Sequence, residues 1–117
     1  MSIEHVLAVV PVRDIDRSRR WYERLFGRPA DNNPMANLVE WHLVSNGWVQ
    51  VFCDDQHAGS TTVNFAVQDL DGHIDELKRR GLEPGEIVAA NKGVQLSSLT
   101  DPDGNNIWLI GGFRVQY

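Results

Sequence analysis

Histidines and closely spaced carboxylates are the side chains of this sequence that could chelate a metal ion or transfer a proton. The four histidines, His5, His42, His57 and His73, are scattered along the chain. No second histidine or carboxylate stands at a useful ligand spacing from His5. Residues 101–105, DPDGN, bring two carboxylates together, but proline followed by glycine is typical of a turn. We therefore interpret this string as turn geometry.

Tryptophans gather on a predicted hairpin. In NLVEWHLVSNGWVQVF, Asn46-Gly47 separates two strand-like runs, which is typical of a two-residue turn. Pairing across this turn places one set of side chains on the same face: Trp41, Leu43, Ser45, Trp48, Gln50 and Phe52. The opposite face then carries a second set: His42, Val44, Val49 and Val51. The valines suit packing under helices, so the two faces differ in kind.

The chain repeats one pattern of elements. VRDID at residues 12–16 recurs as VQDLD at residues 67–71, an offset of 55 residues. Each copy follows an apolar strand-like run, and its aspartates are typical of a helix start. The following helices carry one apolar stripe each and end near Gly27 and Gly81. Two successive strand–helix–strand units are therefore predicted.

Composition limits the class of protein. With 117 residues, 42% hydrophobic and 23% charged, the chain has the size and composition of one folded domain, residues 1–117. A net charge of −5 argues against nucleic acid and anionic membranes as partners. Neither a membrane span nor a signal peptide is apparent, so we expect a cytoplasmic protein. The lone Cys53, within WVQVFC, is interpreted as a packed thiol.

Three strings resemble the glyoxalase/bleomycin resistance/dioxygenase (vicinal oxygen chelate) superfamily along nearly the whole chain. They are VVPVRDIDRSRRWYERLFGRP, VNFAVQDLDGHIDELKRRG and DPDGNNIWLI. The resemblance implies an α+β fold with two βαβββ modules, at about residues 1–57 and 58–117. It also implies that eight strands curl into a mixed-sheet cup with the helices outside. A homodimer with a ligand inside the cup is expected on the same ground.

The metal positions of the family are mostly filled by other residue types here. Enzymes of this superfamily hold a divalent metal on four strands with histidine, glutamine or glutamate. The resemblance assigns those positions to Leu7, Gln50, Thr62 and Trp108, of which Gln50 alone is a residue type that the family uses. We therefore predict no metal site and no cofactor.

The cup is expected to be aromatic and nearly uncharged. Counting by two along the strands adds Leu7, Val9, Thr62, Asn64 and Trp108 to the tryptophan face of the hairpin. Asp54, at a strand end, is the one charge expected nearby. Indole rings stack well on flat π-systems. The favoured hypothesis is a metal-free, non-enzymatic protein that sequesters a neutral or weakly charged planar aromatic molecule, antibiotic-like compounds included.

Two alternatives remain open at this stage. A metal-dependent lyase, dioxygenase or transferase of the same superfamily could use unorthodox ligands such as His5 and Gln50. A metal-free isomerase or cyclase would need a general acid–base pair in the cup, and none can be assigned there from the sequence. Bound metal in the purified protein would favour the first of these alternatives.

Overall fold

The computed structural model describes residues 2–113, and its N-terminal half forms one βαβββ module. This N-terminal module comprises β1 (Val6–Val12), α1 (Ile15–Phe26), β2 (Asn32–Met35), β3 (Leu38–Val44) and β4 (Gly47–Cys53). Its sheet has the order β1-β4-β3-β2, with β1 parallel to β4 and the other neighbours antiparallel.

The second half repeats this arrangement. The C-terminal module comprises β5 (Thr62–Val67), α2 (Leu70–Arg79), β6 (Val88–Ala89), β7 (Gln95–Thr100) and β8 (Asn106–Gly111). A short 3₁₀ turn lies between β6 and β7. The order β5-β8-β7-β6, with β5 parallel to β8, matches the first sheet strand for strand.

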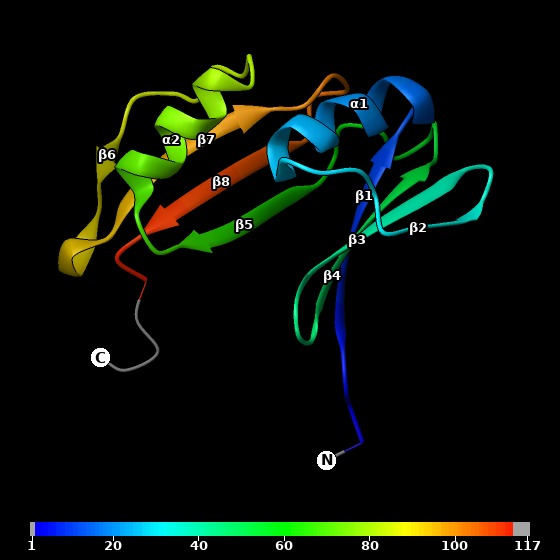
Figure 1. Ribbon diagram of the computed structural model, residues 1–117, viewed down its shortest axis with the longest axis horizontal. Helices are drawn as coiled ribbons and strands as arrows, with labels where there is room; N and C mark the ends of the chain where they lie inside the picture. Colours follow the sequence, from blue (N-terminus) through cyan, green and yellow to red (C-terminus); the bar gives the residue numbers. More distant parts are fainter. Residues whose placement is uncertain (1, 114–117) are drawn as a thin grey trace.

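The predicted α+β fold of two βαβββ modules is confirmed, with eight strands divided between two mixed sheets. Within residues 2–113 no hydrogen-bonded ladder joins the two sheets, so they do not form one closed cup in a single chain. Strands β1 and β5 are therefore both sheet edges. Figure 1 shows the modules side by side, with α1 and α2 on the same side of the molecule. We call the face of each sheet that lies opposite its helix the open face.

The predicted helix starts follow from side-chain capping. The Asp14 carboxylate accepts hydrogen bonds from the amides of Asp16 and Arg17, at 3.0 and 3.1 Å. Asp69 accepts one from the amide of Gly72 at 3.2 Å. Each bond satisfies an amide that has no partner inside the helix. These aspartates are therefore structural, as the sequence pattern predicted.

Each helix covers one face of its sheet, but the two cores differ in composition. In the N-terminal module the ring of Tyr22 lies 6.3 Å from that of Trp41, and Phe26 lies 5.3 Å from Trp41. The C-terminal module buries aliphatic side chains instead: Val63, Leu70, Ile74, Leu77, Leu99, Ile107 and Leu109. The N-terminal core thus adds a cluster of aromatic rings to its buried valines, whereas the buried hydrophobic side chains of the C-terminal core are aliphatic.

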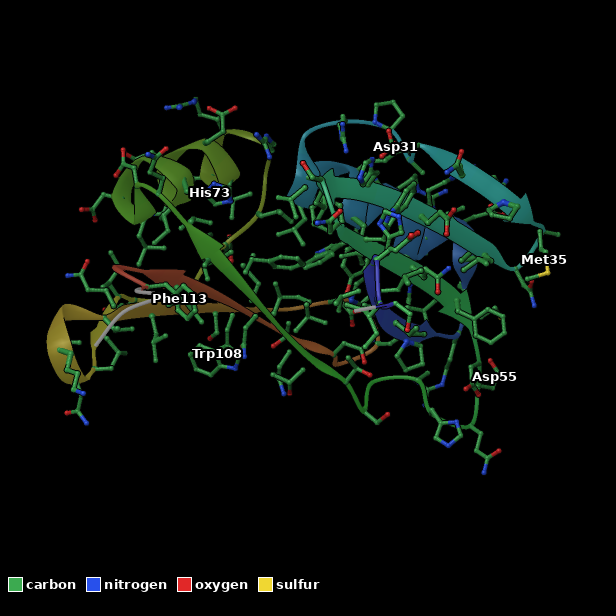
Figure 2. The ribbon with its side chains drawn as sticks, turned by 90° about the horizontal axis from the view of Figure 1, so that it is seen from below. Asp31, Met35, Asp55, His73, Trp108 and Phe113 are labelled. Carbon is green, nitrogen blue, oxygen red and sulfur yellow. The ribbon has the colours of Figure 1, made fainter. Side chains whose placement is uncertain are left out.

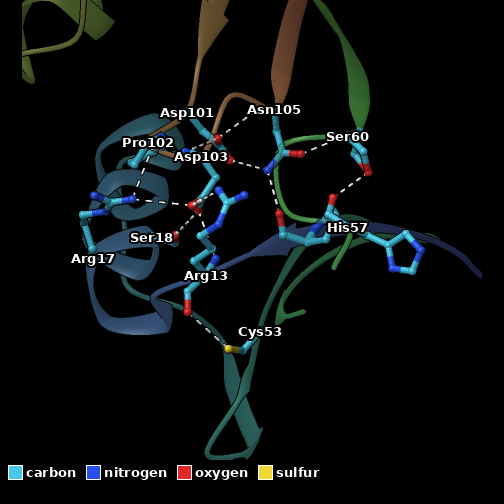
Figure 3. Close-up of polar contacts among 12 residues, drawn as sticks. Arg13, Arg17, Ser18, Cys53, His57, Ser60, Asp101, Pro102, Asp103 and Asn105 are labelled. Carbon is cyan, nitrogen blue, oxygen red and sulfur yellow. Dashed lines mark hydrogen bonds and ion pairs between the residues drawn. The ribbon is translucent and has the colours of Figure 1, made fainter. Parts of the chain in front are cut away.

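A polar network attaches the turn after β7 to the start of α1 (Figure 3). The Asp103 side chain is 1% exposed and accepts from the Arg13 amide at 3.2 Å and from the Ser18 hydroxyl at 3.4 Å. The guanidinium groups of Arg13 and Arg17 each lie 3.5 Å from the same carboxylate. Because buried carboxylates need such partners, this contact fixes one module against the other.

Asp101 and Asn105 extend the same network inward. The Tyr22 hydroxyl donates to Asp101 at 2.7 Å, and Asn105 Nδ2 donates to Asp101 at 2.8 Å and to the Pro11 carbonyl at 2.8 Å. Burial, followed by the neighbouring Asp101 carboxylate, raises the pKa of the Tyr22 phenol well above its ordinary range. The DPDGN string forms a turn as predicted, with Gly104 at φ 99°, and it also links the modules.

A second link lies at the other end of α1. Arg80, directly after α2, donates from Nη1 to the carbonyls of Arg24 and Leu25, both at 3.1 Å. Gly27 has φ 75° and ends α1, and a Cβ there would lie 2.7 Å from the Arg80 guanidinium carbon. The absence of a side chain at Gly27 therefore gives Arg80 access to the helix end. We call these two links the N-terminal and C-terminal clasps of α1.

None of the helices among residues 2–113 is long and apolar enough to cross a membrane.

Candidate functional site

The open face of the N-terminal module brings together most of the side chains predicted for the cup in that half. In the parallel pair of β1 and β4, Leu7 stands beside Trp48 and Val9 beside Gln50. Leu7 and Val9 are 47% and 48% exposed, whereas Val10 and Val12 are fully buried under α1. Trp48, Gln50 and Phe52 are each partly exposed. The predicted alternation of β1 and β4 is therefore confirmed.

The predicted register of the hairpin is wrong. Strand β3 pairs Trp41 with Val49 and His42 with Trp48, and the turn consists of Ser45 and Asn46. Trp41 is fully buried beneath α1, where its indole nitrogen donates to the Arg28 carbonyl at 3.1 Å. Trp41 therefore does not belong to the open face.

A bulge accounts for the altered register. The pairing shifts by one residue between His42 and Val44, so Leu43 has no partner across the hairpin. Neither Asn46 nor Gly47 has the positive φ that the predicted Asn-Gly turn requires. A shift of the pairing by one residue moves the side chains of a strand to the other face of the sheet. Val44, predicted to pack under the helices, is accordingly 67% exposed.

The expected chemistry of the open face changes with the register. His42 was predicted on the helix side, yet it lies on the open face beside Trp48, and Glu40 lies on the same face beside Gln50. Burying a carboxylate and an imidazole under α1 without partners would cost several kcal/mol, about 2–7 for a polar group alone. The charge of Glu40 is therefore the sequence signal that favours the observed register. The prediction that Asp54 is the one charge near the cup is also wrong.

Glu40 is held in place by two amide side chains. Gln50 Nε2 donates to one oxygen of its carboxylate at 2.9 Å, and Asn32 Nδ2 donates to the other at 3.2 Å. Beside this pair the imidazole of His42 stacks on the indole of Trp48, with centroids 4.2 Å apart and planes 11° apart. The face therefore combines a flat aromatic surface with an oriented negative charge.

On the C-terminal open face, the strands within residues 2–113 place uncharged side chains. Strand register places Asn64 beside Trp108 and Thr62 beside Asn106, with Ser98 on the far side of Trp108. Thr62 and Asn64 are exposed, and Trp108 is partly exposed. In Figure 2, Trp108 and His73 lie on opposite sides of this sheet, in agreement with an indole on the face away from α2. All three residues thus lie on the face of the sheet away from α2.

A groove of about 360 Å³ runs between the two sheet edges. Its walls are mainly apolar and come from both modules: Val6, Ala8, Leu43, Val44, Gly47, Trp48 and Val49 on one side and Val63, Asn64, Phe65 and Ala66 on the other. Leu43 packs partly against the core instead of lying on the open face. The groove thus unites three predicted site residues, Leu43, Trp48 and Asn64. Leu7, Gln50, Phe52, Thr62 and Trp108 do not line it.

A smaller hollow of about 240 Å³ adjoins the groove on the helix side and reaches His73 and Arg80. Burial, and then the nearby Arg80 charge, lowers the pKa of His73. His57 pairs with Asp54 at 2.9 Å in the loop after β4, and this hydrogen bond lowers the pKa of the Asp54 carboxyl. The His57 side chain is 61% exposed, which is typical of a surface pair.

The donor set at the family's metal positions does not fit a metal ion. Leu7 and Trp108 offer no ligand atom, and the Gln50 amide donates to Glu40. Among residues 2–113 no three histidine, cysteine or acidic side chains come close enough together to hold a metal. His5 is exposed and belongs to no such group.

Comparison with known proteins identifies the fold. No protein-family model and no curated protein matches this sequence. A solved glyoxalase / bleomycin resistance protein from Catenulispora acidiphila DSM 44928 is 26% identical, with TM-score 0.85 over 92% of this chain and 96% of that chain.

Two more distant structures share the fold. A bleomycin-binding protein complexed with bleomycin is 20% identical, with TM-score 0.77 over 93% of this chain and 98% of that chain. A lactoylglutathione lyase from Agrobacterium tumefaciens is 17% identical, with TM-score 0.72 over 92% of each chain. A binding protein and an enzyme thus share this architecture, so its chemistry must be argued from the site. By its paired modules and by this likeness, the chain has the fold of the glyoxalase/bleomycin resistance (vicinal oxygen chelate) proteins.

Proposed function

We propose that this protein binds a planar aromatic small molecule, antibiotic-like compounds included, on the open faces of its two sheets. The observation that carries the proposal is the position of Trp48 and Trp108, which stand partly exposed on the open faces and not in either core. Each indole can add about 1 kcal/mol to the binding of a stacked ring beyond the area it buries. The bleomycin complex of a protein with the same fold is a precedent for such use of the architecture.

The N-terminal face favours a ligand that carries a hydrogen-bond donor or a positive charge. Glu40 lies beside the His42–Trp48 stack, and its carboxylate keeps acceptor capacity after the two amide contacts. A ring stacked on Trp48 could point an N–H or ammonium group at that carboxylate. This narrows the expectation of a neutral or weakly charged ligand, which rested on a cup without carboxylates.

Sequestration explains this surface better than catalysis does. Both Glu40 oxygens accept from amides, and the ring of His42 contacts the Ser45 carbonyl at 3.0 Å, so neither group is paired for proton transfer. Leu7, Thr62 and Trp108 offer no metal-binding set. We accordingly propose that binding needs neither metal nor cofactor.

We further propose that a second copy of the chain completes the binding site. Within one chain the clasps join the modules at α1, and the edges β1 and β5 remain unpaired with each other. Large apolar side chains are exposed along this side, including Ile3 at 70% and Val6 at 69%. Light scattering coupled to size-exclusion chromatography should give the mass of a dimer. The mass of a monomer at all accessible concentrations would contradict this part of the proposal.

A fluorescence titration tests the proposed ligand class. Proflavine, a planar cation, should quench tryptophan emission saturably, and more tightly than anthracene-type neutral rings of equal size. EDTA should leave the titration unchanged if no metal takes part. Trp21→Phe is the matched control, because Trp21 lies on α1 against Tyr22 and away from the open faces. Linear, unsaturable quenching by every planar compound would overturn the proposal.

A further inference from the structure

A basic pocket lies on the helix side of the molecule, away from the open faces. It has a volume of about 520 Å³ and is formed around the end of α1: Arg20, Glu23, Arg24, Gly27, Arg28, Pro29 and Arg80. Four of these seven residues are arginines, in a chain whose net charge is −5. Three arginines come from the N-terminal module, and Arg80 comes from the C-terminal module.

Two of the four arginines are fixed by contacts within the protein. Arg80 makes the C-terminal clasp of α1 and lies 3.5 Å from Glu76. Arg28 pairs with Asp31 at 3.0 Å and also donates to the His42 carbonyl. These bonds hold both guanidinium groups at the pocket, so little conformational entropy would be lost on their binding an anion.

The other two arginines have no carboxylate partner within residues 2–113. No ion pair or side-chain hydrogen bond is formed there by the guanidinium of Arg20 or of Arg24. Nearby carboxylates are accounted for: Asp31 pairs with Arg28, and Glu76 pairs with Arg79 and Arg80. Glu23 is the one acidic side chain in the pocket wall. The wall therefore carries an excess of positive charge.

Helix capping alone does not account for this cluster. Cations near the end of a helix are stabilised by its negative pole. Arg80 already supplies that interaction through direct bonds to the last-turn carbonyls of Arg24 and Leu25. The guanidinium groups of Arg20 and Arg24, which have no partner in the described part of the chain, thus remain available for a ligand.

We propose that this pocket binds a compact oxyanion of the phosphate class, of the size of pyrophosphate. Guanidinium groups offer paired N–H donors that match phosphate oxygens, and several of them can share one multivalent anion. Because the arginines come from both modules, a bound anion would bridge the modules at the C-terminal clasp. Binding should therefore raise the thermal unfolding midpoint.

Calorimetric titration with sodium pyrophosphate tests the proposal, with ionic strength held constant by sodium chloride. The wild-type protein should bind one anion per chain saturably, and its unfolding midpoint should rise. The double variant Arg20→Gln/Arg24→Gln should weaken binding about tenfold or more, since two charge-assisted contacts are lost. Arg19→Gln is the matched control, because Arg19 lies on the same helix, outside the pocket, 3.6 Å from Asp16.

The outcomes separate a built site from general charge attraction. Circular dichroism of each variant first establishes that it is folded. Loss of binding in the double variant with retention in Arg19→Gln supports the proposal. No saturable binding by the wild type, or equal weakening in Arg19→Gln and in the double variant, overturns it. The test does not depend on the aromatic ligand, because the pocket shares no residue with the open faces.

Discussion

The two modules repeat one backbone pattern but differ in what they bury and in what they leave open. The N-terminal core contains Tyr22, Phe26 and Trp41 in ring contact, and its open face carries Glu40 beside Trp48. The C-terminal core is aliphatic, and the described part of its open face surrounds Trp108 with threonine, serine and asparagine. The repeat therefore determines where strands and helices lie, while the chemistry of each face is set separately.

Within the N-terminal module the sharpest comparison is between two tryptophans on one hairpin. Trp41 is fully buried and Trp48 is partly exposed. Trp41→Ala should lower the free energy of unfolding by about 3–5 kcal/mol, because a large cavity would remain under α1. Trp48→Ala should cost less than about 1 kcal/mol, as an open-face residue would. Urea unfolding of both variants gives the comparison, and equal losses would contradict the assigned faces.

The C-terminal clasp can be separated from backbone strain by comparing two glycines. Gly27 and Gly81 both have positive φ, but a Cβ meets the Arg80 guanidinium at Gly27 and open space at Gly81. Each alanine substitution should cost about 1–2 kcal/mol for the left-handed conformation. Gly27→Ala should cost a further ~1 kcal/mol, because the added methyl group displaces the Arg80 guanidinium and its hydrogen bonds to α1 are lost. If Gly81→Ala proves as destabilising as Gly27→Ala, the clasp contributes nothing measurable.

The N-terminal clasp should be visible in the dependence of stability on alkaline pH. Burial and Asp101 raise the pKa of Tyr22, so the folded phenol keeps a proton that the unfolded chain releases above pH about 10. The unfolded state then binds fewer protons, and stability falls by up to about 1.4 kcal/mol per pH unit. Tyr22→Phe should reduce this slope in denaturant titrations across that range. A slope identical to that of the wild type would show that Tyr22 ionises normally.

The smallest expected effect concerns the charge that distinguishes the two open faces. Glu40→Gln keeps the size of the side chain but removes the negative charge beside Trp48. Affinity for a planar cation should fall a few-fold, about 0.5–1 kcal/mol, as for a partly exposed pair. Affinity for a neutral ring should stay the same. Equal affinity of Glu40→Gln and wild type for proflavine would show that Glu40 does not contribute to ligand binding.

The modules could be predicted because their signals are local, and the hairpin face could not. An apolar run, an aspartate cap and a helical stripe lie within about twenty residues of each other in each module, in line with typical element lengths. The face on which Trp41 lies depends on a bulge at Leu43. No residue type in the hairpin indicates this bulge. The clasps could not be predicted either, because their partners are distant in the sequence: Tyr22 and Asp101 are 79 residues apart.

A double-mutant cycle on the open-face tryptophans tests the central claim most directly, since it asks whether both modules contact one ligand. Dissociation constants for proflavine would be measured by titration calorimetry in the wild type, Trp48→Ala, Trp108→Ala and the double variant. Each single substitution should weaken binding about tenfold, and the double variant should lose less than the sum of both, because the rings share one ligand. Unchanged affinity in Trp108→Ala would contradict a site built from both modules.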